Sequence, residues 1–127
     1  MKRNYLARRV QIWFRDTEWA NGLFEEIISN IPVIAIERVL HSSQRGVHTC
    51  YLTDGSTIKT LPTTEGFMRG ARGTEIYIQD GVDKDTYDWI IAKCPIFPCS
   101  GIWVISSVED FRKPFGMTAR EYYEKCE

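Results

Sequence analysis

The first forty residues place an amphipathic helix between two β-prone runs, and this order constrains the fold more than any other feature. Residues 10–14 alternate as a strand does, and Asp16 or Thr17 can then cap a helix that Pro32 ends. The apolar side chains of that helix share one face: Trp19, Leu23, Phe24, Ile27 and Ile28. Residues 33–40 read as the next strand. Strand, helix and strand over about thirty residues are typical of a right-handed βαβ unit, which predicts that the two strands pair in parallel.

The rest of the chain adds a hairpin and a second helical unit. Asp54-Gly55 separates two β-rich runs and predicts a hairpin closed by a type I′ turn, which needs positive φ at both central positions. The elements expected around it are strands at 47–52, 56–61 and 75–79, a helix capped by Asp83 or Asp85 and stopped by Pro95, a strand at 102–105 buried on both faces, and a helix opened by Thr118. Together they predict a single α/β domain over residues 1–127. Its sheet is expected to be mixed and mostly parallel, with one antiparallel hairpin and flanking helices.

Composition and charge narrow the classes of partner. Lys and Arg number 16 against 17 Asp and Glu, a net charge of −1, and this balance argues against a nucleic-acid partner. No apolar run is long enough to span a membrane and no secretory signal is visible, so a cytoplasmic protein is expected. The cysteines read as free thiols, because their spacings relative to His41 and His48 fit no common zinc template. No metal or other cofactor is predicted.

Four segments suggest a family when they are taken in order. They are 54–58 (DGSTI), 68–72 (MRGAR), 76–80 (IYIQD) and 100–107 (SGIWVISS). In this order and spacing they resemble the ATPase core of phage terminase large subunits, the motors that package DNA, and their helicase-like relatives. In that family a strand and an "RG" loop lead into the Walker B strand, and a later strand ends in the Ser/Thr coupling motif. The resemblance covers about residues 10–107.

Two departures from the family pattern predict a protein that is not an enzyme. No G-x-x-x-x-G-K-[ST] phosphate loop occurs, so the backbone cradle and the Lys for nucleotide phosphates are missing. The Walker B end is altered under either alignment. In one, Gln79 replaces the magnesium-binding Asp and Asp80 replaces the catalytic Glu; in the other, Asp80 is the magnesium ligand and Gly81 replaces the Glu. Without these groups the chain is not expected to hydrolyse ATP by itself.

The same stretch supplies the candidate binding residues. These are Arg69, Gly70, Arg72, Gly73, Asp80 and Ser106. Guanidinium groups beside glycine backbone suit an anion, and ligands of open α/β sheets lie at the carboxyl ends of the strands. A solvated loop with a surface pair of charges, or a bond from Arg69 to Asp80, explains the two arginines equally well.

The expected function is a non-catalytic phage or prophage accessory protein that binds a nucleotide-type ligand or signal, and that could thereby blunt a host defence. One alternative is a protein-interaction module that regulates a packaging motor or inhibits a host nucleic-acid enzyme. Another is an ATPase fragment completed in trans. A homo-oligomer suits the binding roles, because small binding proteins often form their sites between protomers.

Overall fold

The computed structural model describes residues 7–63, 72–95 and 101–107. Its elements are β1 (Arg9–Phe14), α1 (Thr17–Ser29), the 3-10 turn η1 (Val33–Ala35), β2 (Ile36–Ser42), β3 (Val47–Leu52), β4 (Thr57–Pro62), β5 (Glu75–Gln79), α2 (Lys84–Lys93) and β6 (Gly101–Ile105). Asp83 rather than Asp85 caps α2, since its carboxylate accepts a hydrogen bond from the Thr86 amide. The helix expected from Thr118 lies outside the described residues.

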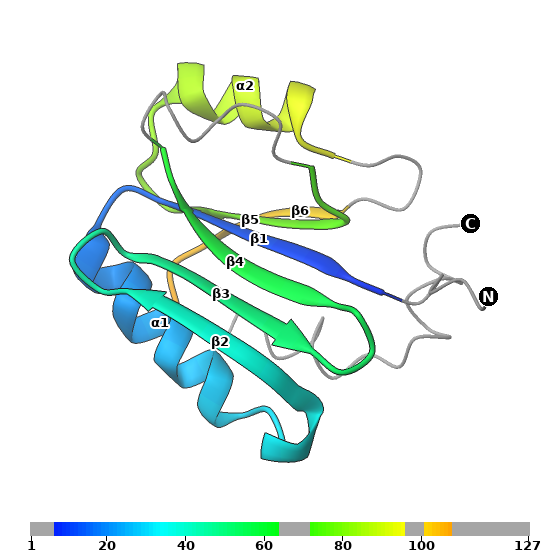
Figure 1. Ribbon diagram of the computed structural model, residues 1–127. Helices are drawn as coiled ribbons and strands as arrows, with labels where there is room; N and C mark the ends of the chain where they lie inside the picture. The colour runs from blue at the N-terminus through cyan, green and yellow to red at the C-terminus, as the bar shows by residue number, and fades with distance from the viewer. Residues whose placement is uncertain (1–6, 64–71, 96–100, 108–127) are drawn as a thin grey trace.

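The strands form one six-stranded sheet in the order β2-β3-β4-β1-β5-β6 (Figure 1). β4, β1, β5 and β6 run parallel to one another, whereas β3 runs antiparallel to both of its neighbours, β2 and β4. This confirms the predicted α/β class and the mixed, mostly parallel sheet.

The predicted parallel pairing of the first two strands is wrong. β2 does not lie beside β1, because two successive tight turns fold β3 and β4 back and place β4 at that position. β2 becomes an edge strand instead. Its outward side chains at Arg38 and Leu40 are exposed, as an edge position allows.

The turn between β3 and β4 also differs from the predicted type. The Gly55 amide donates to the Leu52 carbonyl and the Leu52 amide donates to the Ser56 carbonyl, so the loop holds three residues. Only Gly55 has a positive φ, of 91°. This is the three-residue hairpin loop in which glycine alone adopts the left-handed conformation, and the hairpin itself is confirmed.

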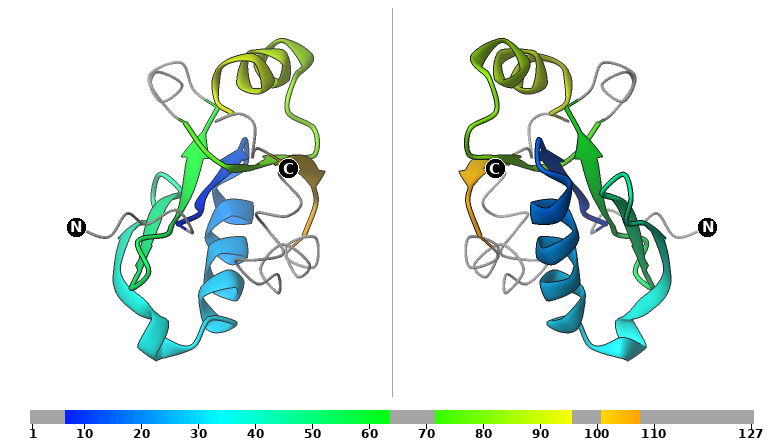
Figure 2. Two further views of the ribbon diagram at one scale, coloured as in Figure 1. Left: turned by 90° about the vertical axis from the view of Figure 1, so that its right-hand side faces the viewer. Right: turned by 90° about the vertical axis from the view of Figure 1, so that its left-hand side faces the viewer.

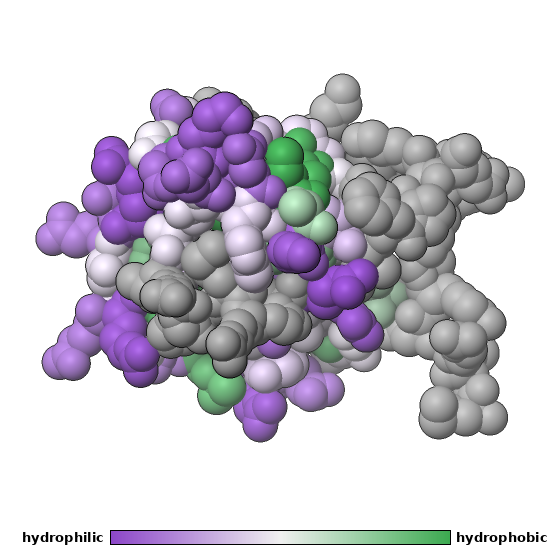
Figure 3. Space-filling view, turned by 90° about the horizontal axis from the view of Figure 1, so that it is seen from above, coloured by the Kyte–Doolittle hydropathy of each residue, from purple (hydrophilic) through white to green (hydrophobic). Residues whose placement is uncertain are grey.

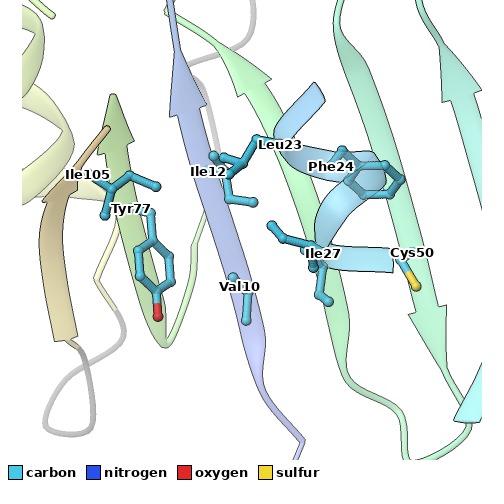
Figure 4. Packing of buried hydrophobic residues seen from close by; sticks show 9 residues of the cluster. Val10, Ile12, Leu23, Phe24, Ile27, Cys50, Tyr77 and Ile105 are labelled. Carbon is cyan, nitrogen blue, oxygen red and sulfur yellow. The ribbon is translucent and has the colours of Figure 1, made fainter. Parts of the chain in front are cut away.

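The larger hydrophobic core lies between α1 and one face of the sheet. Figure 4 shows Ile12 of β1 and Tyr77 of β5 on this side, together with Leu23, Phe24 and Ile27 from α1. The side chains that α1 contributes recur at the spacing of an amphipathic helix, as its sequence predicts.

A smaller core lies on the opposite face, under α2. It joins Ile90 and Cys94 of α2 to Trp13, Ile76 and Ile78 of the sheet. Figure 2 shows the two helices at different places on the sheet, and Figure 1 shows that α2 lies at one end of it. Among the described residues, no helix crosses the broad surface of β2, β3 and the neighbouring half of β4 on that side.

β6 corrects a further expectation. It is an edge strand of the described sheet and Val104 is 54% exposed, so it is not buried on both faces. Seen from the side of α2, the described surface is largely hydrophilic, with small and separate hydrophobic patches (Figure 3). No helix within the described ranges is long and apolar enough to cross a membrane.

Candidate functional site

The structure separates the predicted binding residues into two groups at opposite edges of the sheet. Asp80 and Ser106 directly follow β5 and β6, at the carboxyl edge of the parallel strands, and the Asp80 amide donates to the Ile105 carbonyl. Arg72 and Gly73 precede β5, at the amino edge. At about 3.3 Å per extended residue, roughly 20 Å separates Gly73 from Asp80. The single pocket predicted from both groups is therefore not formed by these four residues, and Arg69 and Gly70 lie outside the described residues.

The carboxyl edge is organised by the Gln79 side chain. Its Oε1 accepts hydrogen bonds from the amides of Arg15 and Asp16, at 2.8 and 3.1 Å, and its Nε2 donates to an Asp16 carboxylate oxygen at 2.9 Å. Gln79 is buried and uses both ends of its amide to hold the turn after β1. Its contacts give the residue a structural role at the position where one of the two possible family alignments places the magnesium ligand.

Acidic groups surround the shallow groove at this edge. The groove has a volume of about 490 Å³ and is lined by Ser106, by Trp19 and by the α1 residues Glu18 and Glu26. The Trp19 indole nitrogen donates to the Ser106 carbonyl at 2.9 Å. Two carboxylates in the lining disfavour a phosphate ligand here.

A second groove lies at the amino edge, on the same face of the sheet as α2. Its volume is about 400 Å³, and its lining includes Arg9, Gln11, Thr57, Lys59, Leu61 and Arg72. We call it the amino-edge groove. It brings one predicted site residue, Arg72, next to side chains from β1 and β4 that the sequence did not single out.

The register of β1 against β4 creates this groove. Arg9 pairs with Thr57 and Gln11 pairs with Lys59, so these four side chains point to the same face. Val10 between them points to the α1 core and is buried. The alternation of a half-buried strand thus places one charged side chain from each strand beside a polar neighbour.

The cations of the amino-edge groove differ from the neighbouring Arg8. Arg8 forms a two-pronged ion pair with the buried Glu75 carboxylate, at 2.5 and 2.6 Å. Within the part of the chain that the structure describes, Arg9, Lys59 and Arg72 make no ion pair and no carboxylate lines the groove. The Arg72 guanidinium has one long hydrogen bond, 3.4 Å, to the Pro95 carbonyl. Three positive charges around one hollow make an electropositive site.

Gln11 lines the amino-edge groove, and Gly73, the residue after Arg72, packs against it. A Cβ at Gly73 would lie 2.9 Å from the Arg9 carbonyl oxygen and 2.9 Å from Gln11 Cγ, so only glycine fits. Gln11 Oε1 accepts a hydrogen bond from the Trp13 indole at 3.0 Å. That bond orients the amide and leaves its nitrogen as a donor without a partner among the described residues.

Hydrogen bonds link the two histidine side chains to each other and to Asn21. Asn21 Nδ2 donates to the Ser43 carbonyl, which leaves Asn21 Oδ1 to accept from His48 Nε2 at 2.6 Å. His48 Nδ1 then accepts from His41 Nδ1 at 3.1 Å. Burial, and next the neighbouring His41, lower the pKa of His48, which therefore stays neutral at pH 7.

The two described cysteines, Cys50 and Cys94, do not join the histidines in a metal site. Cys50 lies in the α1 core and Cys94 in the α2 core, on opposite faces of the sheet. The described residues contain no group of three or more potential ligands that could hold a metal ion. Burial raises the pKa of the Cys94 thiol to about 11, although Arg72 opposes this shift. Cys99 and Cys126 lie outside the described residues.

No protein-family model, curated protein or solved structure matches the chain. The resemblance to terminase ATPase cores therefore stays a prediction from the sequence. The amino-edge groove is the described feature with the clearest chemistry, and its charges favour an anionic ligand.

Proposed function

We propose that the protein is a non-catalytic binding protein that takes a phosphate-bearing, nucleotide-type ligand in the amino-edge groove. The observation that supports this most is the placement of Arg9, Lys59 and Arg72 around one hollow in which no described lining residue is a carboxylate. Guanidinium groups bind phosphate oxygens through parallel hydrogen bonds, and an ammonium group adds a compact positive charge. The Gln11 amide nitrogen supplies a neutral donor beside them.

Two features support binding rather than turnover. The sequence holds no phosphate loop, and Gln79 uses its amide to hold the turn after β1. On the terminase resemblance we further propose a phage or prophage accessory role in the host cytoplasm. Sequestering a nucleotide signal there would blunt a host defence that depends on it.

A protein-interaction role is the second candidate. β2 is an open edge strand, and the side chains of Val33 and Ile34 just before it are 86% and 88% exposed. An edge strand with exposed apolar neighbours can pair with a strand of another chain. A homo-oligomer built in this way remains a proposal.

Calorimetric titration with ADP, ATP and cyclic dinucleotides, with and without Mg²⁺, tests the first proposal. We expect saturable binding without turnover, and at 100 times Kd a ligand should add about 2.7 kcal/mol to the free energy of unfolding. Lys59→Gln and Arg72→Gln should each weaken binding. Lys84→Gln is the matched control, because Lys84 lies at the start of α2, at the carboxyl edge, and its side chain is 83% exposed. No binding across the panel, or equal weakening by all three substitutions, would contradict the proposal.

A further inference from the structure

The amino-edge groove continues into a row of side chains that crosses four strands. On the face that carries the groove, Arg38 of β2 pairs with Tyr51 of β3, Tyr51 pairs with Thr57 of β4, and Thr57 pairs with Arg9 of β1. With a strand spacing of about 4.8 Å, the row is roughly 14 Å long. It therefore begins at an arginine, ends at an arginine and passes an aromatic ring between them.

The second row of this face adds a further cation and no carboxylate. Leu40, Thr49, Lys59 and Gln11 follow one another across the same four strands. None of the cross-strand pairs on this face includes Asp or Glu. Figure 1 shows this surface of β2, β3 and β4 toward the viewer, with α1 behind it. We call it the open sheet face.

The charges of α1 contrast with those of the open sheet face. α1, which covers the opposite side, contains three Glu and no Lys or Arg. The open sheet face and the amino-edge groove together hold four cations: Arg9, Arg38, Lys59 and Arg72. The overall net charge of −1 does not report this local cluster of cations, because it sums the charges of the whole chain. The net charge alone, which argues against a nucleic-acid partner, therefore does not describe this face.

Tyr51 and Arg38 supply a planar surface on the open sheet face. The Arg38 guanidinium lies over the Tyr51 ring, 4.6 Å from its centroid. Nucleobases stack on aromatic rings and on guanidinium planes, and every base offers a π-face for this contact. A planar stack beside a line of cations combines the two elements that proteins use for single strands.

We infer that the open sheet face binds single-stranded nucleic acid. Its phosphates would meet Arg9, Lys59 and Arg72, and one base would stack at Arg38 and Tyr51. The row is about as long as four stacked nucleotides at roughly 3.4 Å each, and this length exceeds what one mononucleotide can contact. The inference rests on the proposed phosphate site and names the class of ligand that fills it: an oligonucleotide rather than a free nucleotide.

The experiment compares three probes on the full chain. Fluorescence anisotropy measures binding of labelled (dT)8 and (U)8 and of an abasic oligomer of the same length and charge, and calorimetry measures ADP. We expect (dT)8 or (U)8 to bind at least tenfold more tightly than ADP. The abasic oligomer should bind roughly tenfold more weakly than (dT)8, because it has no bases to stack. The slope of log K against log salt should be about −2.1, from roughly 0.7 per phosphate for the three cations that meet phosphates.

Variants separate the stack from the phosphate contacts. Tyr51→Leu should lower the affinity for (dT)8 roughly tenfold and leave the affinity for ADP unchanged. Tyr51→Phe keeps the aromatic ring and should keep the affinity for (dT)8. Lys59→Gln should weaken both ligands and reduce the salt slope by about 0.7, whereas Lys84→Gln should change neither. Urea unfolding of each variant establishes that the comparison is made on folded protein.

The failures of the two proposals are distinguishable. One outcome is that ADP binding depends on Lys59, that (dT)8 and (U)8 bind no more tightly than ADP, and that Tyr51→Leu does not change their affinity. That outcome overturns the oligonucleotide inference and leaves the proposed function standing. The inference is also overturned if the abasic oligomer binds as tightly as (dT)8, or if poly-glutamate competes as well as unlabelled (dT)8 does. Either result would show that the face binds any polyanion. If no probe binds, both proposals fall.

Discussion

Replacing Gln79 by Glu tests whether this residue is a structural clamp. The substitution keeps the size of the side chain and the oxygen that accepts from the amides of Arg15 and Asp16. It changes the other end, where the amide nitrogen donates to the Asp16 carboxylate at 2.9 Å. A carboxylate introduced there faces a carboxylate at hydrogen-bond distance, so the main effect is electrostatic repulsion.

Coulomb's law sets the size of this effect. At 2.9 Å two like charges repel by about 1.4 kcal/mol at the dielectric constant of water, and by about 5.7 kcal/mol at an effective value of 20. The Asp16 side chain is 54% exposed, and Arg15 Nε lies 3.6 Å from the same carboxylate oxygen. Exposure and this neighbouring cation place the expected loss near the lower bound, at ~2 kcal/mol of the free energy of unfolding.

Urea unfolding at two pH values measures the loss. At pH 7 we expect Gln79→Glu to lower the free energy of unfolding by ~2 kcal/mol, and near pH 4 we expect most of the loss to disappear, because a protonated carboxyl donates as the amide did. Adding Asp16→Asn restores a donor opposite the introduced carboxylate and should recover most of the stability at pH 7. A loss that is the same at both pH values, or that Asp16→Asn leaves unchanged, would refute the role of Gln79 as a clamp.

Three further predictions follow from described contacts. Since the pKa of His48 is lowered in the folded protein, its neutral form contributes stability that is fully present above the unfolded pKa of about 6.5 and is lost as pH falls toward the folded value. Thermal unfolding from pH 8 to pH 5 should show this decline, and His48→Gln should flatten it. Gly73→Ala should lower the free energy of unfolding by ~1–3 kcal/mol, because the added Cβ meets the Arg9 carbonyl and Gln11. A urea midpoint equal to that of the unchanged protein would contradict this packing. Cys94, with a pKa of about 11, should react with iodoacetamide at pH 7.5 far more slowly than a free cysteine; fast labelling of the folded protein, mapped by mass spectrometry, would show that it is accessible.

The sequence predicted most elements because the apolar patterns and end signals of these segments are local. The face of α1, the cap of α2 by Asp83 and the hairpin at Asp54-Gly55 each depend on residues within a few positions of one another. The position of β4 beside β1 depends instead on two hairpins folding back together. No local pattern distinguishes that arrangement from a direct βαβ pair.

The candidate site could be predicted only in part, because some of its residues are brought together by strand pairing rather than by a local pattern. Arg72 and Gly73 are predicted from the arginines and glycines of one local segment. Arg9 and Lys59 come near Arg72 only through the register of β1 against β4. Alternation within each strand places Arg9 opposite to the buried Val10, and Lys59 opposite to the buried Ile58. That signal was present in the sequence, but it becomes a site only once the two strands are known to be neighbours.

The most direct test of the amino-edge groove is to map the ligand on the backbone by NMR. In an amide-proton and nitrogen titration of the labelled protein with ADP and with (dT)8, the groove predicts shifts at Arg72 to Thr74 and at Thr57 to Lys59, which lie at the amino edge. The amides of Asp80 and Ser106 should stay unperturbed. Shifts confined to Asp80 and Ser106 would place the ligand at the carboxyl edge and contradict the assignment.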